Sequence, residues 1–151
     1  MARRASAPPD PLEALADALH SAAIHLLRRL RREDDATGLS PARLSALSVV
    51  VFGGPLRISD LARAEQVRTP TITPIVAALE ADGLIAREPD ARDARASILR
   101  ATPKGRKLMA QGRARRVARL AAELRAVPAE DLGVLRRAAA LMEELSRRDR
   151  G

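Results

Sequence analysis

Cysteine, tryptophan and tyrosine are absent from this chain, and Phe52 is its single aromatic residue. Without cysteine there is no disulfide scaffold, no thiolate nucleophile, no cysteine zinc site and no cysteine-based redox switch. The sequence also lacks a Gly-rich phosphate loop, a G-x-S-x-G motif and a His-carboxylate cluster at metal-binding spacing, so an enzyme is not expected. No apolar run approaches the ~20 residues that span a bilayer, and we expect a cytoplasmic protein.

What the chain does contain is small aliphatic residues and arginine. Of its 151 residues 46% are hydrophobic, and an interior of Ala, Leu, Val and Ile favours helices over sheets. The 27 basic and 19 acidic residues leave a net charge of +8, which indicates a polyanionic partner, either nucleic acid or an anionic membrane surface. The basic segments lack the Trp or Phe anchors of interfacial helices, so a membrane partner is not expected.

The N-terminal third of the chain is predicted to form two helices. Residues 1–10 hold prolines and small residues that bury nothing, and we expect a disordered lead there. Apolar residues then recur every three or four positions as far as Leu30, which is the pattern of an amphipathic helix. A second helix is predicted to begin with Ser40 as its cap and to stop at Gly53. These helices, within residues 11–54, are assigned to dimerisation and to support of the next segment.

Residues 55–102 carry the most informative pattern. Ser59 is predicted to cap one short helix and Thr69 to open another, with a connection of about three residues, a spacing typical of a helix-turn-helix. Apolar residues at i, i+3, i+4 and i+7 form the buried face of the second helix, and its other face is small and uncharged. The next segment reads as a strand over 84–87, a polar turn and a strand over 96–100. A helix-turn-helix followed directly by a β-hairpin is a winged helix.

Two more helices are predicted after the hairpin, over residues 103–127 and 129–147, and both carry apolar stripes. Together with the stripe of the first helix, these surfaces exceed what one small winged helix can cover, and the simplest partner is a second copy of the chain. We therefore assign residues 103–151 to C-terminal dimerisation helices. The expected fold is mainly α, with a small β-hairpin wing.

The chain resembles the MarR-type transcriptional regulators from about residue 12 to residue 147. The matching motifs are Ser59-Asp-Leu-Ala, the segment Leu79-Glu-Ala-Asp-Gly-Leu-Ile-Ala-Arg87, and the wing Asp93-Ala-Arg95 that leads into Leu99-Arg-Ala-Thr102-Pro-Lys-Gly105. The resemblance implies an obligate homodimer, joined through its first and last helices, that binds double-stranded DNA at a pseudo-palindromic operator, typically as a repressor. It places the recognition helix 69–82 in the major groove and the wing 88–96 in the minor groove.

Eight residues are the candidate DNA contacts. A winged helix needs a helix start that presents backbone N–H groups to phosphate and a cation that enters a narrow groove, and Thr69 and Arg95 are placed for these roles. By the family motif, Asp93 would brace Arg95, while Arg92 would reach flanking phosphates. The alternatives without a DNA contact are a solvent-exposed hairpin for the wing residues and ordinary helix-start hydrogen bonding for the threonines. The full candidate set is Arg68, Thr69, Thr71, Thr73, Arg92, Asp93, Arg95 and Lys104.

Pro74 departs from the family pattern. Because proline has no N–H to donate to the carbonyl of Pro70, we expect a distorted or kinked first turn. Sequence readout would then come from threonine contacts with thymine methyls, from Arg68 or from DNA shape, and the sequence does not rank these. Residues 55–102 hold seven basic and seven acidic residues, whereas residues 103–127 hold eight basic residues and one acidic residue. The alternative function is therefore a winged-helix protein-interaction module with little sequence-specific DNA binding.

A small organic effector, anionic or phenolic, is the ligand class that remains, because the cysteine and clustered-ligand sensors of the family have no counterpart here. Family architecture would line its pocket with His20, Ile24, Leu27, Leu47, Val51, Met109 and Arg113. His20 and His25 are the only histidines and lie about 140° apart around a helix, so they cannot easily share a metal ion. No metal or other cofactor is expected, and a pH or ligand role for either histidine stays open.

Overall fold

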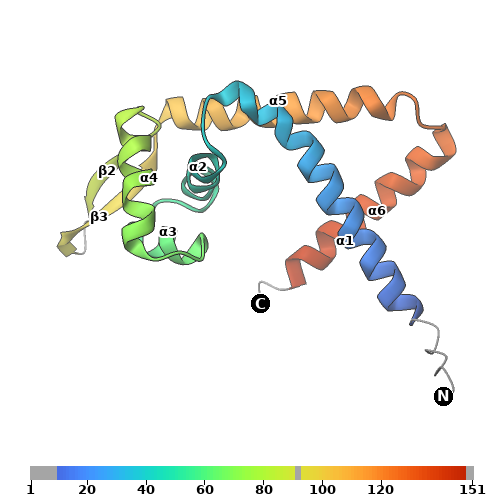
Figure 1. The fold of residues 1–151 in the computed structure, drawn as a ribbon, viewed down its shortest axis with the longest axis horizontal. Helices are drawn as coiled ribbons and strands as arrows, with labels where there is room; N and C mark the ends of the chain where they lie inside the picture. The colour runs from blue at the N-terminus through green and yellow to red at the C-terminus, as the bar shows by residue number, and fades with distance from the viewer. Residues whose placement is uncertain (1–9, 91–92, 149–151) are drawn as a thin grey trace, which may run out of the picture. The chain divides into compact units, whose positions relative to one another are not determined.

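The structure, a computed structural model, describes residues 10–90 and 93–148. It is mainly α-helical with a small antiparallel sheet (Figure 1), which confirms the predicted fold class. The chain forms two compact units, residues 1–113 and 114–151, and the division falls inside a long helix. The functional boundaries at residues 54 and 102 stay a prediction. In chain order the elements are α1 (Pro11–Leu30), the 3-10 helix η1 (Arg31–Thr37), α2 (Pro41–Gly53), β1 (Leu56–Arg57), α3 (Ile58–Ala64), α4 (Thr69–Ala81), β2 (Ile85–Asp90), β3 (Asp93–Ala101), α5 (Pro103–Leu124) and α6 (Ala129–Arg148).

The core of the first unit lies between α2, α3, α4 and the sheet. Met109 of α5 joins the same cluster, whereas Phe52, the one aromatic residue, is exposed. The core of this winged-helix lobe, residues 39–109, is therefore built without aromatic side chains, mostly from aliphatic ones, as the composition predicts. The largest side chains that are completely buried are Leu47, Val50, Leu61, Ile72, Val76, Leu79 and Leu99.

The first two helices begin where the sequence predicts. Asp10 caps α1 by accepting a hydrogen bond from the backbone N–H of Leu12 at 3.0 Å. Ser40 caps α2 by accepting a hydrogen bond from the backbone N–H of Arg43 at 3.4 Å, and the helix ends at Gly53 as predicted. The predicted disordered lead falls on residues 1–9, which lie outside the described residues, and on Asp10, which instead serves as the cap. A 3-10 helix, which the sequence pattern did not indicate, extends α1.

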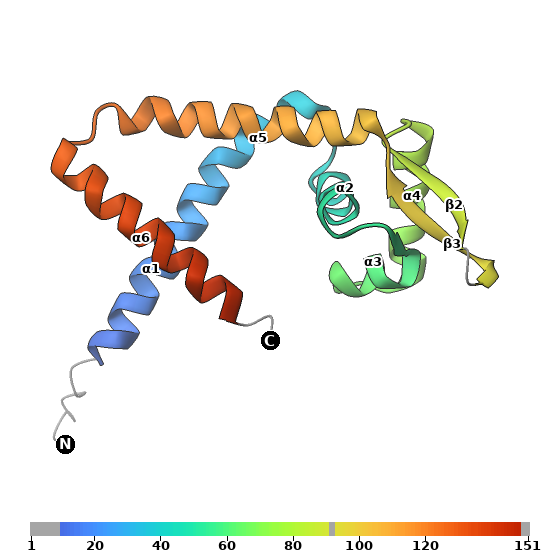
Figure 2. The ribbon, with the colours of Figure 1, turned by 180° about the vertical axis from the view of Figure 1, so that it is seen from behind.

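The sheet contains one strand more than predicted. Its order is β1-β3-β2 with antiparallel pairing, and the two-residue strand β1 adds Leu56 opposite Leu99. The hairpin strands are also longer than predicted and leave only residues 91–92 between them. Pro89 was assigned to the turn but pairs with Ser97, because β2 is an edge strand where a missing N–H is tolerated. The hairpin runs alongside α4 (Figures 1 and 2).

The predicted cap of α3 is wrong, whereas the predicted start of α4 is confirmed. Helix α3 begins at Ile58, one residue before Ser59, and its N-cap Arg57 makes no side-chain cap bond. The chain passes directly from β1 into the helix, so no polar cap precedes it. Helix α4 does open at Thr69, but its N-cap is Arg68, whose guanidinium has no acceptor atom. The carbonyl of Arg68 instead accepts the backbone N–H of Thr71 at 2.9 Å.

Proline residues bear on two helices. Helix α4 continues through Pro74 to Ala81, and the expected distortion of its first turn stays a prediction. Helix α5 ends at Leu124 rather than at residue 127, and turn bonds such as Val127 N–H to the carbonyl of Leu124 at 3.2 Å follow it. The residue before a proline is disfavoured in helical conformation, and Pro128 therefore stops this helix early. The last predicted helix agrees closely with α6.

Candidate nucleic-acid interface

Helix α4 has one buried face and one exposed face. Ile72, Val76 and Leu79 are buried in the core, as the spacing predicts, while Thr71 and Thr73 are exposed. The Thr73 hydroxyl donates to the carbonyl of Thr69 at 2.7 Å, so its proton is already used within the helix. What the outer face offers to a partner is therefore methyl groups, hydroxyl lone pairs and little charge.

The turn between α3 and α4 has the form of a helix-turn-helix connection. Gln66 adopts a φ of 55°, a left-handed conformation that is uncommon for a residue other than glycine. The next residue, Val67, donates its N–H back to the carbonyl of Ala62 at 2.9 Å and closes the turn. Arg68 follows as the N-cap of α4, with an exposed side chain. The turn thus places a cation at the start of the exposed helix face.

The hairpin is joined to β1 by an ion pair near its tip. Arg57 donates to one carboxylate oxygen of Asp90, from Nε at 3.0 Å and from Nη2 at 2.5 Å. The Asp90 side chain is only 10% exposed, so this is a shielded, charge-assisted contact rather than a loose surface pair. The ladder shifts register between Pro89 and Asp90, which places the contact where the tip begins. This pair fixes the direction of the hairpin.

The structure describes the residues of the predicted wing contacts only in part. Arg92 lies outside the described residues, and so do the side chains of Asp93 and Arg95. The backbone of Asp93 opens β3, opposite Asp90. The proposed bracing of Arg95 by Asp93 therefore stays a prediction.

Lys104 is exposed, but its amine is already engaged. Its Nζ atom donates to the carbonyl oxygen of Asp82 at 2.7 Å, at the C-terminal end of α4. The sequence placed this lysine near the DNA backbone, with no indication of such a contact. Arg43, Arg57, Asp82 and Asp90 also have site roles that the sequence reasoning missed, since each depends on pairing residues more than 30 positions apart.

The predicted effector-pocket residues separate into two groups. Leu47 and Met109 are buried in the core, and Val51 packs against it. His20, Ile24 and Leu27 lie on α1, which buries no side chain between Pro11 and Leu30, and Arg113 is also exposed. An open hollow of about 750 Å³ lies elsewhere, between β1, the start of α3 and the hairpin, and none of these seven residues lines it.

The described residues contain neither a metal-binding cluster nor a single membrane-spanning helix. Within residues 10–90 and 93–148, no group of three or more His, Cys, Asp or Glu side chains is placed to hold a metal ion. In the same part of the chain no single helix is long and apolar enough to cross a membrane. The bent pair Pro11–Thr37 and Pro41–Gly53, with 92° between its two parts, is long and apolar enough only when both parts are taken together.

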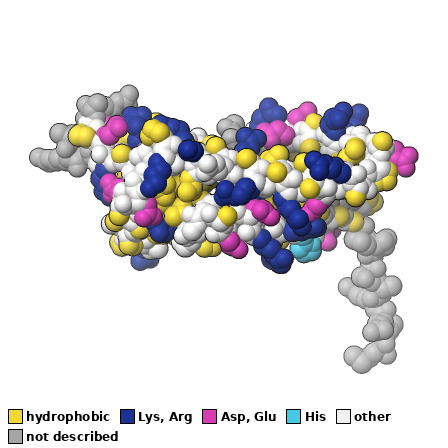
Figure 3. All heavy atoms as spheres, turned by 90° about the horizontal axis from the view of Figure 1, so that it is seen from above, with side chains coloured by type: hydrophobic (Ala, Val, Ile, Leu, Met, Phe, Trp, Pro, Cys, Tyr) yellow, Lys and Arg dark blue, Asp and Glu magenta, His cyan; other side chains and the backbone are white. Residues whose placement is uncertain are grey.

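Basic side chains of residues 55–102 are interspersed with acidic ones. On the face drawn in Figure 3, Lys and Arg side chains lie among hydrophobic and acidic ones. Several arginines of the lobe are paired, among them Arg87 with Glu80 at 3.0 Å and Arg100 with Glu88 at 2.9 Å. The winged-helix segment, residues 55–102, is thus less positively charged than the net charge of the whole chain suggests.

A helix-turn-helix that packs on a three-stranded sheet with a hairpin wing defines the winged helix-turn-helix class of DNA-binding folds. A sequence model of the MarR family matches residues 39–97. An uncharacterised HTH-type transcriptional regulator from Mycobacterium leprae is 32% identical over 131 residues, which cover 87% of this chain and 92% of that protein. An HTH-type transcriptional regulator from Mycobacterium tuberculosis is 32% identical over 128 residues, 85% of this chain and 90% of that one.

Solved structures agree with this result. A transcriptional regulator from Thermotoga maritima superposes with a TM-score of 0.80 at 25% identity and covers 91% of this chain and 96% of its own. A transcriptional regulator from Pseudomonas aeruginosa gives a TM-score of 0.76 at 29% identity, covering 92% and 98%. The chain belongs to the MarR family of transcriptional regulators. Its relatives and its fold are those of regulators, not of enzymes.

Proposed function

We propose that this chain acts as a homodimeric repressor that binds a pseudo-palindromic operator. Each α4 would enter the major groove, and each hairpin would reach the neighbouring minor groove. The observation that carries this proposal is the division of α4 into a buried apolar face and an exposed face with Thr71 and Thr73. The exposed side chain of Arg68 supplies a cation at the N-terminal end of this helix.

The contacts would divide between readout and anchoring. Exposed threonine methyls on α4 suit contact with thymine methyls, and Arg68 suits a base edge or a phosphate. At the exposed N-terminus of α4, the backbone N–H of Thr69 suits a phosphate, whereas Pro70 has no N–H and that of Thr71 bonds the carbonyl of Arg68. At the hairpin tip, Arg95 would enter the minor groove with Asp93 as its brace and Arg92 on the flanking backbone. Arg57 and Asp90 would hold this hairpin in position.

The proposed dimer rests on apolar surface that the single chain leaves uncovered. Leu12 of α1 is 74% exposed and Val134 of α6 is 66% exposed. Helices that carry so many exposed aliphatic side chains need a partner, and an isologous contact between two copies satisfies both at once. The exposed set on these two helices is Leu12, Leu15, Leu19, Ile24, Leu26, Leu27, Val134, Leu135, Leu141, Met142 and Leu145.

The proposed effector is a small anionic or phenolic molecule. A protein of this fold, NadR, was solved with 4-hydroxyphenylacetate and is a precedent for such a ligand. Another, a mutant of Staphylococcus aureus MepR, was solved bound to an oligodeoxyribonucleotide and is a precedent for DNA binding. For this chain, His20, Ile24 and Leu27 on α1 and Arg113 on α5 are exposed and available to such a ligand. Leu47 and Met109 lie in the core and would support the pocket from behind rather than line it. Such a regulator would meet its operator and effector in the bacterial cytoplasm.

Selection from random DNA tests this proposal. The purified full chain is mixed with random-sequence duplexes at two salt concentrations, and the bound pool is sequenced. The proposal predicts an inverted repeat whose half-sites lie about one helical turn apart. Sedimentation of the free protein is expected to give a dimer.

The alternative is a winged-helix module that binds protein and has little sequence preference for DNA. The observation that favours it is the pairing of lobe arginines with acidic residues, as in Arg57 with Asp90 and Arg87 with Glu80. Binding that is unselective and is lost at moderate salt would support this alternative and refute the operator proposal.

A further inference from the structure

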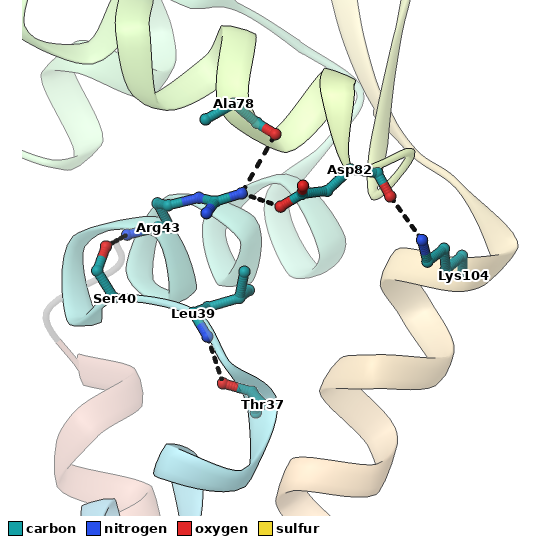
Figure 4. Close-up of polar contacts among 7 residues, drawn as sticks. All are labelled: Thr37, Leu39, Ser40, Arg43, Ala78, Asp82 and Lys104. Atoms are coloured by element: carbon teal, nitrogen blue, oxygen red, sulfur yellow. Dashed lines mark hydrogen bonds and ion pairs between the residues drawn. The ribbon is translucent and has the colours of Figure 1, made fainter.

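The C-terminal end of α4 is held by donors from two other elements (Figure 4). Arg43 of α2 donates from Nη2 to the carbonyl of Ala78 at 3.2 Å and to the carboxylate of Asp82, with which it forms an ion pair. Lys104 of α5 donates from Nζ to the carbonyl of Asp82 at 2.7 Å. Asp82 thus connects three helices through its side chain and its backbone.

The first turn of α5 contacts the same segment. The hydroxyl of Thr102 donates to the carbonyl of Gly83 at 2.7 Å and lies 3.1 Å from the carbonyl of Leu84. The hydroxyl oxygen of Thr102 also accepts the backbone N–H of Gly105 at 3.1 Å and so caps α5. A Cβ atom at Gly105 would lie 2.1 Å from the carbonyl oxygen of Leu84, so the two backbones are in direct contact. The start of α5 and the end of α4 are therefore one rigid junction.

The charges of this junction are suited to a helix end. The last carbonyls of a helix have no partner within it and carry partial negative charge, which cations stabilise. Arg43 is not a loose surface residue, since its side chain is 25% exposed and its Nε atom is buried without a hydrogen-bond partner among the described residues. That unsatisfied donor costs stability, so the contact is better explained by the geometry it imposes than by net stabilisation.

We propose that Arg43, Asp82 and Lys104 are positioning residues that set the direction of α4 for DNA readout. Lys104 acts through the Asp82 carbonyl rather than by contacting phosphate itself. Helix α4 has thirteen residues and is about 20 Å long, so a rotation of about 5° about its C-terminal end moves its N-terminal end by about 2 Å. A displacement of that size removes Thr71 and Thr73 from contact with base edges. The inference rests on the proposed placement of α4 in the major groove.

The test compares Lys104→Gln with Lys107→Gln. Lys107 is exposed on the same helix, so its substitution removes the same charge without the Asp82 contact. Binding of each full-length variant to the selected operator and to a random duplex is measured over a salt series. We expect Lys104→Gln to lower the operator-to-random affinity ratio on the order of tenfold and to leave the salt dependence as in wild type. Glutamine is neutral and its amide reaches less far, so we expect Lys104→Arg, which keeps a cationic donor on a long side chain, to restore the ratio, and Lys107→Gln to leave it unchanged.

A direct phosphate contact gives a different result. It predicts that Lys104→Gln weakens both duplexes equally and reduces the slope of log affinity against log salt by about 0.9, and this result would overturn the proposal. Equal ratios for the Lys104→Gln and Lys107→Gln variants would also overturn it.

Hydrogen exchange of the free protein tests the anchor independently of DNA. We expect Lys104→Gln to accelerate amide exchange in residues 79–84, with exchange across the α2 core unchanged. Unchanged exchange in residues 79–84 would contradict the anchor. If the wild-type protein selects no DNA sequence, the proposed operator function fails, while the exchange experiment still decides whether Lys104 fixes the end of α4.

Discussion

The close approach of α5 to Leu84 makes Gly105→Ala a sharp test of the packing. An added Cβ would lie 2.1 Å from the Leu84 carbonyl oxygen and 3.3 Å from Cδ1 of Leu47. The oxygen belongs to backbone that also accepts the Thr102 N–H at 3.1 Å, so it cannot move aside alone. Overpacking of this kind costs about 1–3 kcal/mol. The gain from alanine in a helix is at most about 1 kcal/mol.

One further contribution to the free energy of unfolding decides the sign. The separation of α5 from Leu84 would strain the hydrogen bonds to that carbonyl, each worth about 1 kcal/mol. We therefore expect Gly105→Ala to lower the free energy of unfolding by about 1–3 kcal/mol, measured by urea denaturation at one fixed protein concentration. Gly133→Ala is the matched control, because a Cβ there meets no atom within 4 Å and gains only helix propensity, about 1 kcal/mol. Equal or greater stability of Gly105→Ala would refute the packing argument.

Three other substitutions test separate parts of the account. Gln66→Gly relieves a residue held at a φ of 55° and should stabilise the lobe by up to about 1 kcal/mol in the same urea assay, whereas a loss of stability would contradict the strain at this turn. Leu15→Glu adds a charge to the apolar face of α1 and should raise the dimer dissociation constant at least roughly tenfold by sedimentation, and a dimer of unchanged affinity would remove α1 from the interface. Arg95→Ala should weaken operator binding by about 1–3 kcal/mol with the dimer intact, and unchanged affinity would exclude the wing from readout.

Local pattern predicts most of the fold. The 3.6-residue spacing of Ile72, Val76 and Leu79 places the buried face of α4 correctly, and the Ser40 cap marks the start of α2. The motif that ends the recognition helix and opens α5 is sufficient to indicate the family. These features depend on residues a few positions apart, so one sequence contains all the information that they require.

Contacts between distant residues escape such reasoning. The pairing of Leu56 with Leu99 creates a strand too short to leave a pattern. The pairs of Arg57 with Asp90 and Arg43 with Asp82 join residues 33 and 39 positions apart, and nothing local distinguishes these arginines from solvated ones. For the same reason the sequence does not indicate the bond between the Lys104 amine and the end of α4, and the place of Lys104 near DNA stays a prediction. The effector residues share this difficulty, since α1 spacing does not say what covers its exposed face.

The central claim is that two α4 helices of one dimer read two half-sites on the same side of the duplex. The most direct measurement is the affinity of the full chain for the selected operator, compared with a duplex that carries five extra base pairs between its half-sites. Five base pairs rotate one half-site by about half a turn relative to the other. The account predicts that this insertion reduces binding to the level of a single half-site. Equal affinity for both duplexes would contradict it.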